Sequence, residues 1–428
     1  MQASYFSWTL LFLYVFCITH TQALQLVQYW GQNSASTNHG GKSAQKPLSY
    51  YCQDDTQDIL VVSFVHQFGT NQDLAFDLST ESDRCKGLIQ GTQLLDCPQM
   101  EKEIQACQKR GKKVLLSLGG AAGSYGLASA KDGTTWADKL WNTFGGGAGH
   151  QSRPFGKAVV DGFDLDIEAG SVEGYTAFVK TMRKHYLKDK AKTYYISGAP
   201  QCPFPDAWLG DALDHAWFDF VWVQFYNNYC SPKNSGQFNY DTWEDWAKKK
   251  SVNKKVKLFL GIPASPSAAG SGYLPLKDLM KTVSKLKSSS FFGGIMMWDV
   301  SQAYSQKPNF AKAVAKLIHG KKGANGSGDN DNNGDDEGKG EEDQGSGDND
   351  DDDDDDDNDN NDDDDNGDDD NGNDNDKPTT PAASKTQTQP QPTPTPTKSK
   401  HHHHHSKSKH HTATPSSKPS SSNDDGAR

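Results

Sequence analysis

Signatures of several common protein classes are missing from this chain of 428 residues. No CxxC pair occurs, which argues against a zinc site. No GxGxxG or GxxxxGK element supports the alternative of a doubly wound, nucleotide-binding sheet. The lysines do not cluster with aromatic residues as they do in nucleic-acid-binding proteins. We therefore expect no metal, no cofactor and no nucleic acid as partners.

Long hydrophobic segments are also missing, and the main apolar run near the amino terminus is short. Residues 1–23 contain no Lys, Arg, Asp or Glu, and residues 10–16 are apolar. This run is too short to span a bilayer comfortably, and the small residue Ala23 suits cleavage by signal peptidase. Residues 1–23 are predicted to be a secretory signal peptide, although basic residues are missing from its start. A membrane anchor is the alternative.

Apolar residues become scarce from residue 323 onward. This segment holds 29 acidic and 9 basic residues, so it contributes −20 to the net charge of −12 and leaves +8 on the rest of the chain. Such a composition cannot bury enough apolar surface to offset chain entropy, so residues 323–428 are predicted to be a disordered tail. We interpret it as a solvated spacer. Loose binding of Ca²⁺ by its acidic run, or of Zn²⁺ or Cu²⁺ by His401–His405, is the alternative.

Two further features mark this tail. Asn325, in the tripeptide Asn-Gly-Ser, is a predicted N-glycosylation site at its start. The tail has neither the cysteines and aromatics needed to build a carbohydrate-binding module nor the terminal hydrophobic stretch of a lipid-anchor signal.

The segment between these two ends has the pattern of repeated βα units. Short apolar runs alternate with helical stretches. The runs cover residues 24–30, 59–65, 113–118, 158–168, 194–198, 218–226, 256–262 and 294–298. Helices are predicted at residues 100–110, 172–188, 240–250, 276–287 and 309–319. Eight runs within about 300 residues fit one closed (β/α)8 barrel, so residues 24–322 are predicted to form an α/β TIM-barrel domain.

Polar and aromatic residues follow most of these runs, at the end where such barrels carry their active sites. The residues at these strand ends are Tyr29, Gln32, Gly119, Gly120, Asp166, Glu168, Gln201, Gln224, Tyr226 and Trp298.

The run at residues 158–168 is acidic on one side. Asp164, Asp166 and Glu168 share one parity, and apolar residues separate them, so one face of a strand would carry three carboxyls. Like charges this close repel, and at least one carboxyl must hold its proton longer than a free carboxylic acid. This property suits a proton donor better than a solvated surface strand. Asp161 has the opposite parity and is interpreted as structural.

The motif DGFDLDIE at residues 161–168 resembles the DxxDxDxE signature of glycoside hydrolase family 18, the chitinases. Four other segments resemble the plant-type (class III, hevamine-like) branch of this family, which secreted fungal chitinases share. They are YWGQN at residues 29–33, SLGG at 117–120, QFYNN at 224–228 and MW at 297–298. The resemblance covers about residues 24–320.

The resemblance implies an endochitinase that hydrolyses β-1,4-linked N-acetylglucosamine (GlcNAc) polymers by a retaining, substrate-assisted mechanism. Glu168 would be the acid and base, Asp166 would orient the substrate acetamide, and Asp164 would share a proton with Asp166. The Tyr226 hydroxyl would bond the acetamido oxygen, and Trp298 would form the floor under the reacting sugar. The other implied substrate-binding positions are Tyr29, Gln32, Gly119, Gly120 and Gln224.

Six cysteines remain once Cys17, within the predicted signal, is set aside. An even number in an exported chain predicts three disulfides. Cys202 and Cys230 follow neighbouring strands at the same end of the barrel, so their proximity suggests a pair. The resemblance implies the other two pairs, Cys52–Cys107 and Cys85–Cys97.

Two alternative functions stay open. An endo-β-N-acetylglucosaminidase keeps the same acidic motif, whereas a chitin-binding lectin on the same barrel usually loses the acid or blocks the groove. The expected partners are chitin and GlcNAc oligosaccharides. The protein is expected to be a monomer without a membrane span, secreted or associated with a cell wall through its tail.

Removal of residues 323–428 is expected to leave turnover of soluble GlcNAc oligomers almost unchanged, because the tail is predicted to lie outside the barrel that carries the acidic motif. Initial rates of the full-length and shortened proteins on one soluble oligomer test this. A large loss of turnover in the shortened protein would contradict the domain assignment.

Overall fold

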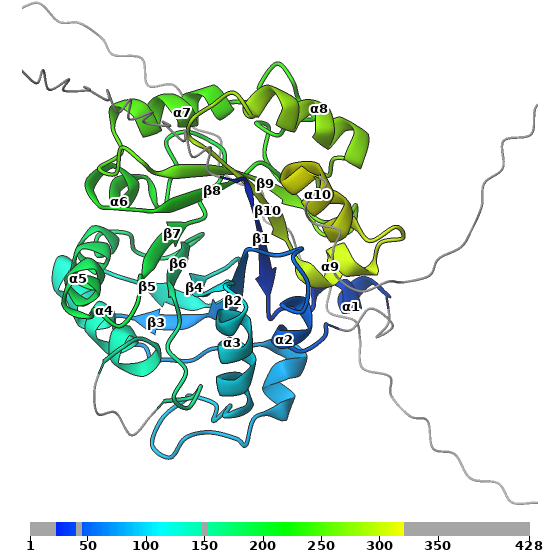
Figure 1. Ribbon diagram of the computed structural model, residues 1–428. Coiled ribbons are helices and arrows are strands. Elements are labelled where there is room, and N and C mark those ends of the chain that lie inside the picture. Colours follow the sequence, from blue (N-terminus) through cyan, green and yellow to red (C-terminus); the bar gives the residue numbers. More distant parts are fainter. Residues whose placement is uncertain (1–22, 40–44, 148–152, 321–428) are drawn as a thin grey trace, which may run out of the picture. The chain divides into compact units, whose positions relative to one another are not determined.

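Eight parallel strands close into a barrel in the computed structural model, which describes residues 23–39, 45–147 and 153–320 (Figure 1). The order around the barrel is β1, β10, β9, β8, β7, β6, β4, β2. The strands are β1 (Gln25–Trp30), β2 (Ile59–Val65), β4 (Lys113–Gly119), β6 (Gly162–Asp166), β7 (Tyr195–Gly198), β8 (Phe220–Gln224), β9 (Lys257–Pro263) and β10 (Phe292–Trp298). Each overlaps one predicted run, so the predicted (β/α)8 barrel is confirmed.

Helices surround the barrel and cover the outside of its strands (Figure 1). They are α1 (Ser34–His39), α2 (Leu48–Tyr51), α3 (Gln99–Lys109), α4 (Ala130–Phe144), α5 (Tyr175–Lys188), α6 (Gly210–His215), α7 (Tyr240–Lys249), α8 (Leu276–Leu286), α9 (Val300–Ser305) and α10 (Phe310–His319), with a 3₁₀ helix at Ser79–Arg84. The five predicted helices correspond to α3, α5, α7, α8 and α10. A short parallel pair, β3 (Gln67–Gly69) with β5 (Ser124–Gly126), lies outside the barrel sheet.

Helix α4 was not predicted, because its sequence contains Gly133 and two adjacent threonines, which are poor helix formers. The Ser129 hydroxyl caps its first turn by accepting a hydrogen bond from the Asp132 amide at 3.1 Å. A Cβ atom at Gly133 would lie 2.0 Å from the carbonyl oxygen of Gly174. Close packing against the start of α5 therefore requires glycine there, and tertiary contact outweighs local propensity.

The barrel interior is filled by side chains. One buried cluster occupies it, made of Val27, Tyr29, Ile59, Val61, Phe64, Leu115, Ala199, Phe220, Trp222, Tyr226, Phe259 and Met296. Residues of the other parity, such as Leu26 and Phe163, pack outward in the core between strands and helices. The interior is therefore a packed core, and a polar residue inside it needs hydrogen-bond partners.

Three disulfides hold loops and helices around this barrel. One links the end of α2 to α3, and another links the loops that follow β7 and β8. The pairs are Cys52–Cys107, Cys85–Cys97 and Cys202–Cys230, the same three that the sequence analysis proposed.

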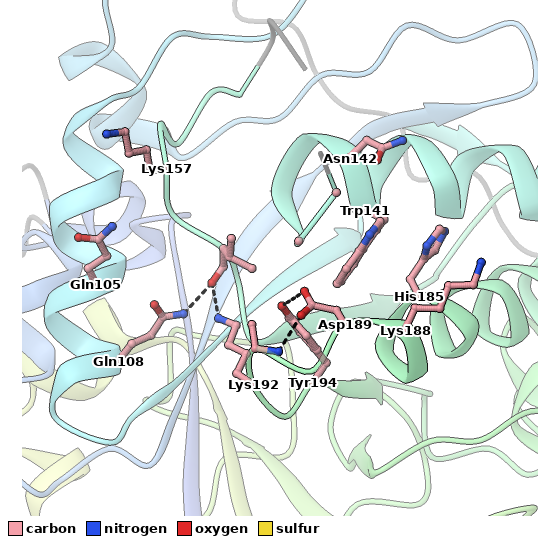
Figure 2. A pocket seen from close by; sticks show the side chains of 14 residues that line it. Gln105, Gln108, Trp141, Asn142, Lys157, His185, Lys188, Asp189, Lys192 and Tyr194 are labelled. Atoms are coloured by element: carbon pink, nitrogen blue, oxygen red, sulfur yellow. Dashed lines mark hydrogen bonds between the residues drawn. The ribbon is translucent and has the colours of Figure 1, made fainter. Parts of the chain in front are cut away.

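A cavity of about 840 Å³ lies beside the amino ends of β6 and β7 (Figure 2). In its floor, the Gln108 amide and the Lys192 ammonium both donate to the carbonyl of Val159, at 2.8 and 2.5 Å. The same two groups reach the carboxylate of Asp161, at 3.0 and 2.8 Å. The Val114 amide also donates to Asp161, at 2.8 Å. These bonds tie the start of β6 to its surroundings, which supports the structural interpretation of Asp161.

The chain ends are not described by the structure. The predicted signal peptide up to residue 22, Asn325, the histidine tract and the rest of the tail lie outside the described residues. Across residues 23–39, 45–147 and 153–320, no helix is long and apolar enough to cross a membrane.

Substitution of Lys192 by Ala is expected to lower the free energy of unfolding by about 1–3 kcal/mol, because it removes a charge-assisted bond to the nearly buried Asp161. Urea unfolding followed by fluorescence measures this. Lys190→Ala, at an exposed lysine of the same loop, is the matched control. Equal stability of the two variants would contradict the proposed role of the Asp161 network.

Candidate active site

The carboxyl ends of the strands surround a cleft. One cavity of about 270 Å³ is lined by Phe64, Ala121, Asp166, Glu168, Gln201, Gln224, Tyr226, Asn227, Asn228, Ala268 and Trp298. A second cavity, of about 280 Å³, is lined by Gln32, Phe64, His66, Asp77, Ala121, Ala122, Gly123 and Trp298. The two share Phe64, Ala121 and Trp298, so they are adjoining parts of one groove.

The three acidic side chains occupy different depths. Strand β6 ends at Asp166, so Glu168 lies just beyond the strand. The alternation of the sequence had predicted it on the strand itself. Asp164 is completely buried, Asp166 is 5% exposed, and Glu168 is partly exposed. The carboxyls thus extend from the barrel interior to the wall of the cleft.

Asp164 is held by hydroxyl groups from three strands. The Tyr29 hydroxyl of β1 donates to it at 2.8 Å, and those of Ser117 on β4 and Ser197 on β7 each donate at 2.7 Å. The Trp222 indole donates in turn to the Tyr29 oxygen at 3.0 Å. Burial raises the pKa of the Asp164 carboxyl, and these donors oppose the increase by stabilising the charged form.

Asp166 and Glu168 act on each other directly. Their carboxyls share a hydrogen bond, and the Gln224 amide donates to both, at 2.8 Å to Asp166 and 3.1 Å to Glu168. Burial raises the pKa of Asp166 well above its usual value, and the charges of Glu168 and Asp164 add to this. Burial also raises the pKa of Glu168, while the Gln224 bond opposes the increase. Asp166 is thus linked to Glu168 by this hydrogen bond, and the sharing of a proton between Asp164 and Asp166 stays a prediction.

The backbone at Glu168 is fixed by a tyrosine that the sequence analysis did not single out. The Glu168 amide donates to the Tyr125 hydroxyl at 3.1 Å, and this hydroxyl donates to the Gly120 carbonyl at 2.6 Å. The Gly120 amide donates to the Asp166 carbonyl at 2.8 Å. A Cβ atom at Gly119, whose φ is +107°, would lie 2.1 Å from that carbonyl. Glycine therefore lets the end of β4 approach the acidic strand.

Aromatic rings form the apolar part of the groove. Trp298 stacks on Phe64 with ring centroids 5.8 Å apart and contacts Tyr29 at 5.5 Å. Tyr226 is 8% exposed and lines the cleft beside the acids. Burial raises the pKa of its hydroxyl well above the usual value, and the charges of Asp166 and Glu168 raise it further, so it stays a hydrogen-bond donor.

Four further residues were predicted to bind substrate, and the structure places them as follows. Tyr29 is 2% exposed and bonds Asp164 inside the barrel, and Gly119 and Gly120 are not among the residues that line the two cavities. Gln32 lines the second cavity, where its amide donates to the carbonyls of Ser63 and Asp77 at 2.9 and 3.1 Å.

The sequence analysis missed Phe64, which lines the cleft, and Tyr125, which supports it. Phe64 lies near the end of β2, where an aromatic residue was a usable signal. Tyr125 lies in β5, outside the barrel strands, so the search along predicted strand ends could not have found it.

Sequence comparisons connect the chain to one hydrolase family. The family described as "Glycosyl hydrolases family 18" matches residues 25–273. "Chitinase 1" of Rhizopus niveus is 45% identical over 309 residues, which are 72% of this chain and 59% of the relative. "Endochitinase" of Saccharomyces cerevisiae is 49% identical over 282 residues, 66% of this chain and 47% of the relative. The chain thus spans about half the length of these curated relatives. It covers 75% of a "Class III chitinase" of Arthroderma benhamiae, at 44% identity.

Solved structures with the same barrel carry different names. A xylanase and α-amylase inhibitor protein from Scadoxus multiflorus has a TM-score of 0.58 at 34% identity, covering 68% of this chain and 98% of that one. The ICChI chitinase from Ipomoea carnea has a TM-score of 0.58 at 30% identity, covering 69% and 100%. The fold alone therefore does not decide between an enzyme and an inhibitor.

Asp166→Asn is expected to raise the melting temperature at neutral pH. A carboxyl whose pKa is higher in the folded than in the unfolded state favours folding below its unfolded pKa, and this stabilisation is lost as pH rises through the folded pKa. Each kcal/mol regained corresponds to roughly 2–4 °C. Melting curves from pH 4 to pH 8 test this, with exposed Asp83→Asn as control. A gain that does not grow with pH would contradict the burial argument.

Proposed function

Because the chain belongs to glycosyl hydrolase family 18, we propose that it is an endochitinase, which hydrolyses β-1,4 linkages in GlcNAc polymers. The observation that carries the proposal is the position of the Glu168 carboxyl, which lines an open groove and is bonded to Asp166 and Gln224. The names of the fungal relatives, which are chitinases and an endochitinase, support the choice of chitin as substrate.

Glu168 is proposed to be the general acid and then the general base. Its carboxyl gives a proton to the glycosidic oxygen as the bond to the anomeric carbon breaks, and later takes a proton from the attacking water. A donor must hold its proton at the working pH, and burial raises the pKa of Glu168 in the required direction. Activity should therefore persist below this pKa and fall as pH rises through it.

The nucleophile is proposed to belong to the substrate. The carbonyl oxygen of the sugar's own acetamide attacks the anomeric carbon and forms an oxazolinium-type ring, which water opens with net retention. Asp166 would accept the acetamide N–H, and the Tyr226 hydroxyl would donate to the acetamido oxygen. Both side chains line the same cavity as Glu168, as this arrangement requires. Asp164 would share a proton with Asp166, whose pKa it raises.

The groove suits a GlcNAc chain because it combines apolar faces with amide groups. Trp298 and Phe64 offer stacked rings to the face of a sugar, and Gln201, Asn227 and Asn228 offer polar groups to its hydroxyls. We propose Trp298 as the floor under the reacting sugar, with Gln224 and Gln32 as further substrate-binding residues on the two parts of the groove.

The two alternatives make different demands on this site. An endo-β-N-acetylglucosaminidase would release N-glycans from a glycoprotein, whereas the proposed enzyme releases short GlcNAc oligomers from colloidal chitin. A lectin or inhibitor would bind without cleaving. Assays on both substrates, with anomeric analysis of the products, separate the three.

We also propose that the protein is exported, and that residues 24–322 form its catalytic domain. The three disulfides support an oxidising compartment. The exported protein would either stay at a cell wall, held through residues 323–428, or be released into the medium.

Glu168→Gln is expected to lower the rate of chitin oligomer cleavage by ~10²–10⁴-fold, because the amide keeps the shape but cannot donate an acidic proton. Initial rates with a soluble GlcNAc oligomer measure the loss. Glu173→Gln, at an exposed carboxyl of the following loop, is the matched control and should match the unaltered chain. If Glu168→Gln cleaved as fast as its control, the assignment of the acid would be wrong.

A further inference from the structure

Asp206 is a buried carboxyl that the proposed mechanism does not use, and its charge acts on both Asp166 and Glu168. Asp206 is 6% exposed and belongs to the loop between β7 and α6. It accepts backbone hydrogen bonds from Gln201 at 2.9 Å, Trp208 at 3.0 Å and Leu209 at 2.6 Å. The carboxyl therefore closes the loop from its first residues to its last.

This loop leads directly to the groove. Gln201 pairs with Gln224 in a parallel bridge, and the Gln224 amide donates to Glu168 at 3.1 Å. The Gln201 side-chain oxygen accepts a bond from the Asn228 amide at 3.2 Å, and both side chains line the cleft. Asp206 thus acts on the site through Gln201.

The loop cannot shift without disturbing Gln224. The backbone N–H of Gln224 donates to the Pro200 carbonyl at 2.8 Å, and the backbone N–H of Cys202 donates to the backbone carbonyl of Gln224 at 3.2 Å. The disulfide from Cys202 to Cys230 joins the loops that follow β7 and β8. Movement of residues 200–202 would therefore shift the backbone of Gln224, and with it the side-chain amide that bonds Asp166 and Glu168.

Asp206 also contributes charge. Among the residues that the structure describes, no Lys, Arg or His forms an ion pair with it. Burial raises the pKa of Asp206, and its three N–H donors oppose this by stabilising the ionised form. The negative charge raises the pKa of both Asp166 and Glu168.

We propose that Asp206 is a positioning residue of the reaction, which fixes Gln201 at the cleft and keeps a negative charge behind the Asp166–Glu168 pair. This inference rests on the proposed function. The charged and titratable groups that act on Glu168 are Asp166, Asp206, Tyr125 and Tyr226, and the neutral Gln224 amide bonds it. Asp206 is the one carboxyl of this set that lies outside the acidic motif.

The test is the pH dependence of kcat/KM for full-length Asp206→Asn on a soluble GlcNAc oligomer. A neighbouring negative charge holds the acid's proton to higher pH, so its removal should move the alkaline limb of the profile to lower pH. KM should also rise, because the amide cannot accept all three backbone bonds and Gln201 is less well fixed. A purely structural residue would leave the limb in place.

Asp219→Asn is the matched control. Asp219 also accepts a backbone bond, from Ile196 at 2.8 Å, but it is ion-paired with Arg183 and precedes β8 at the other end of the barrel. Its loss removes the same charge, and its profile should superimpose on that of the unaltered chain.

Three further variants separate charge from position. Asp206→Ser keeps a short acceptor without charge and should shift the limb as Asp206→Asn does, which covers the case in which one of the two fails to fold. Asp206→Glu keeps the negative charge, so the alkaline limb of its pH profile should stay where it is in the unaltered chain. Gln201→Ala leaves Asp206 in place, so it should raise KM without moving the limb.

The outcomes are distinguishable. If the unaltered chain cleaves no chitin oligomer, the proposed function fails. If it cleaves and a folded neutral variant at position 206 keeps the alkaline limb, this inference alone is overturned. A limb that moves equally in Gln201→Ala would also overturn it, because the charge of Asp206 would then not be the cause.

Discussion

The carboxyl of Asp164 is the buried ionisable group on which the interior of the barrel depends. An ionisable group without contact to water is tolerated only where hydrogen bonds replace those that solvent would make. Here three hydroxyls, from β1, β4 and β7, reach its two oxygens, and a tryptophan on β8 supports one of them. Because the donors come from strands on different sides of the barrel, the Asp164 carboxyl gains all of its hydrogen bonds only when the barrel is closed.

One strand and its flanks hold carboxyls in three environments. Asp161, before the strand, is paired with Lys192, whereas Asp164 is surrounded by neutral hydroxyls. Asp166 faces Glu168 and Gln224, where like charge and burial combine to raise its pKa. A structural carboxyl, an internal support and a hydrogen-bonded pair of carboxyls therefore arise within a few residues. The last environment is unfavourable for folding at neutral pH and suits acid–base chemistry.

The cleft owes its geometry to residues behind its lining. Tyr125 holds the backbone of Glu168, and the glycine pair at the end of β4 allows the acidic strand to come close. On the other side, Asp206 and the Cys202–Cys230 disulfide fix the loops that carry Gln201 and Asn228. None of these supports needs to touch a sugar, yet each sets where a group that lines the groove can lie.

The sequence by itself determined the eight strands, the acidic alternation and the end of the barrel where the site lies. These features follow from local backbone geometry and chain order, since a strand alternates its faces with a period of two and eight βα units suit one closed barrel. Only the tertiary structure decided that Gln224 bonds both Asp166 and Glu168, that Tyr29 lies inside the barrel, and that Tyr125 and Asp206 bond the backbone of segments beside the site. The tertiary structure also explains helix α4, because its Gly133 packs closely against Gly174. Such partners lie far apart in the chain, so their contacts exist only once the barrel has closed.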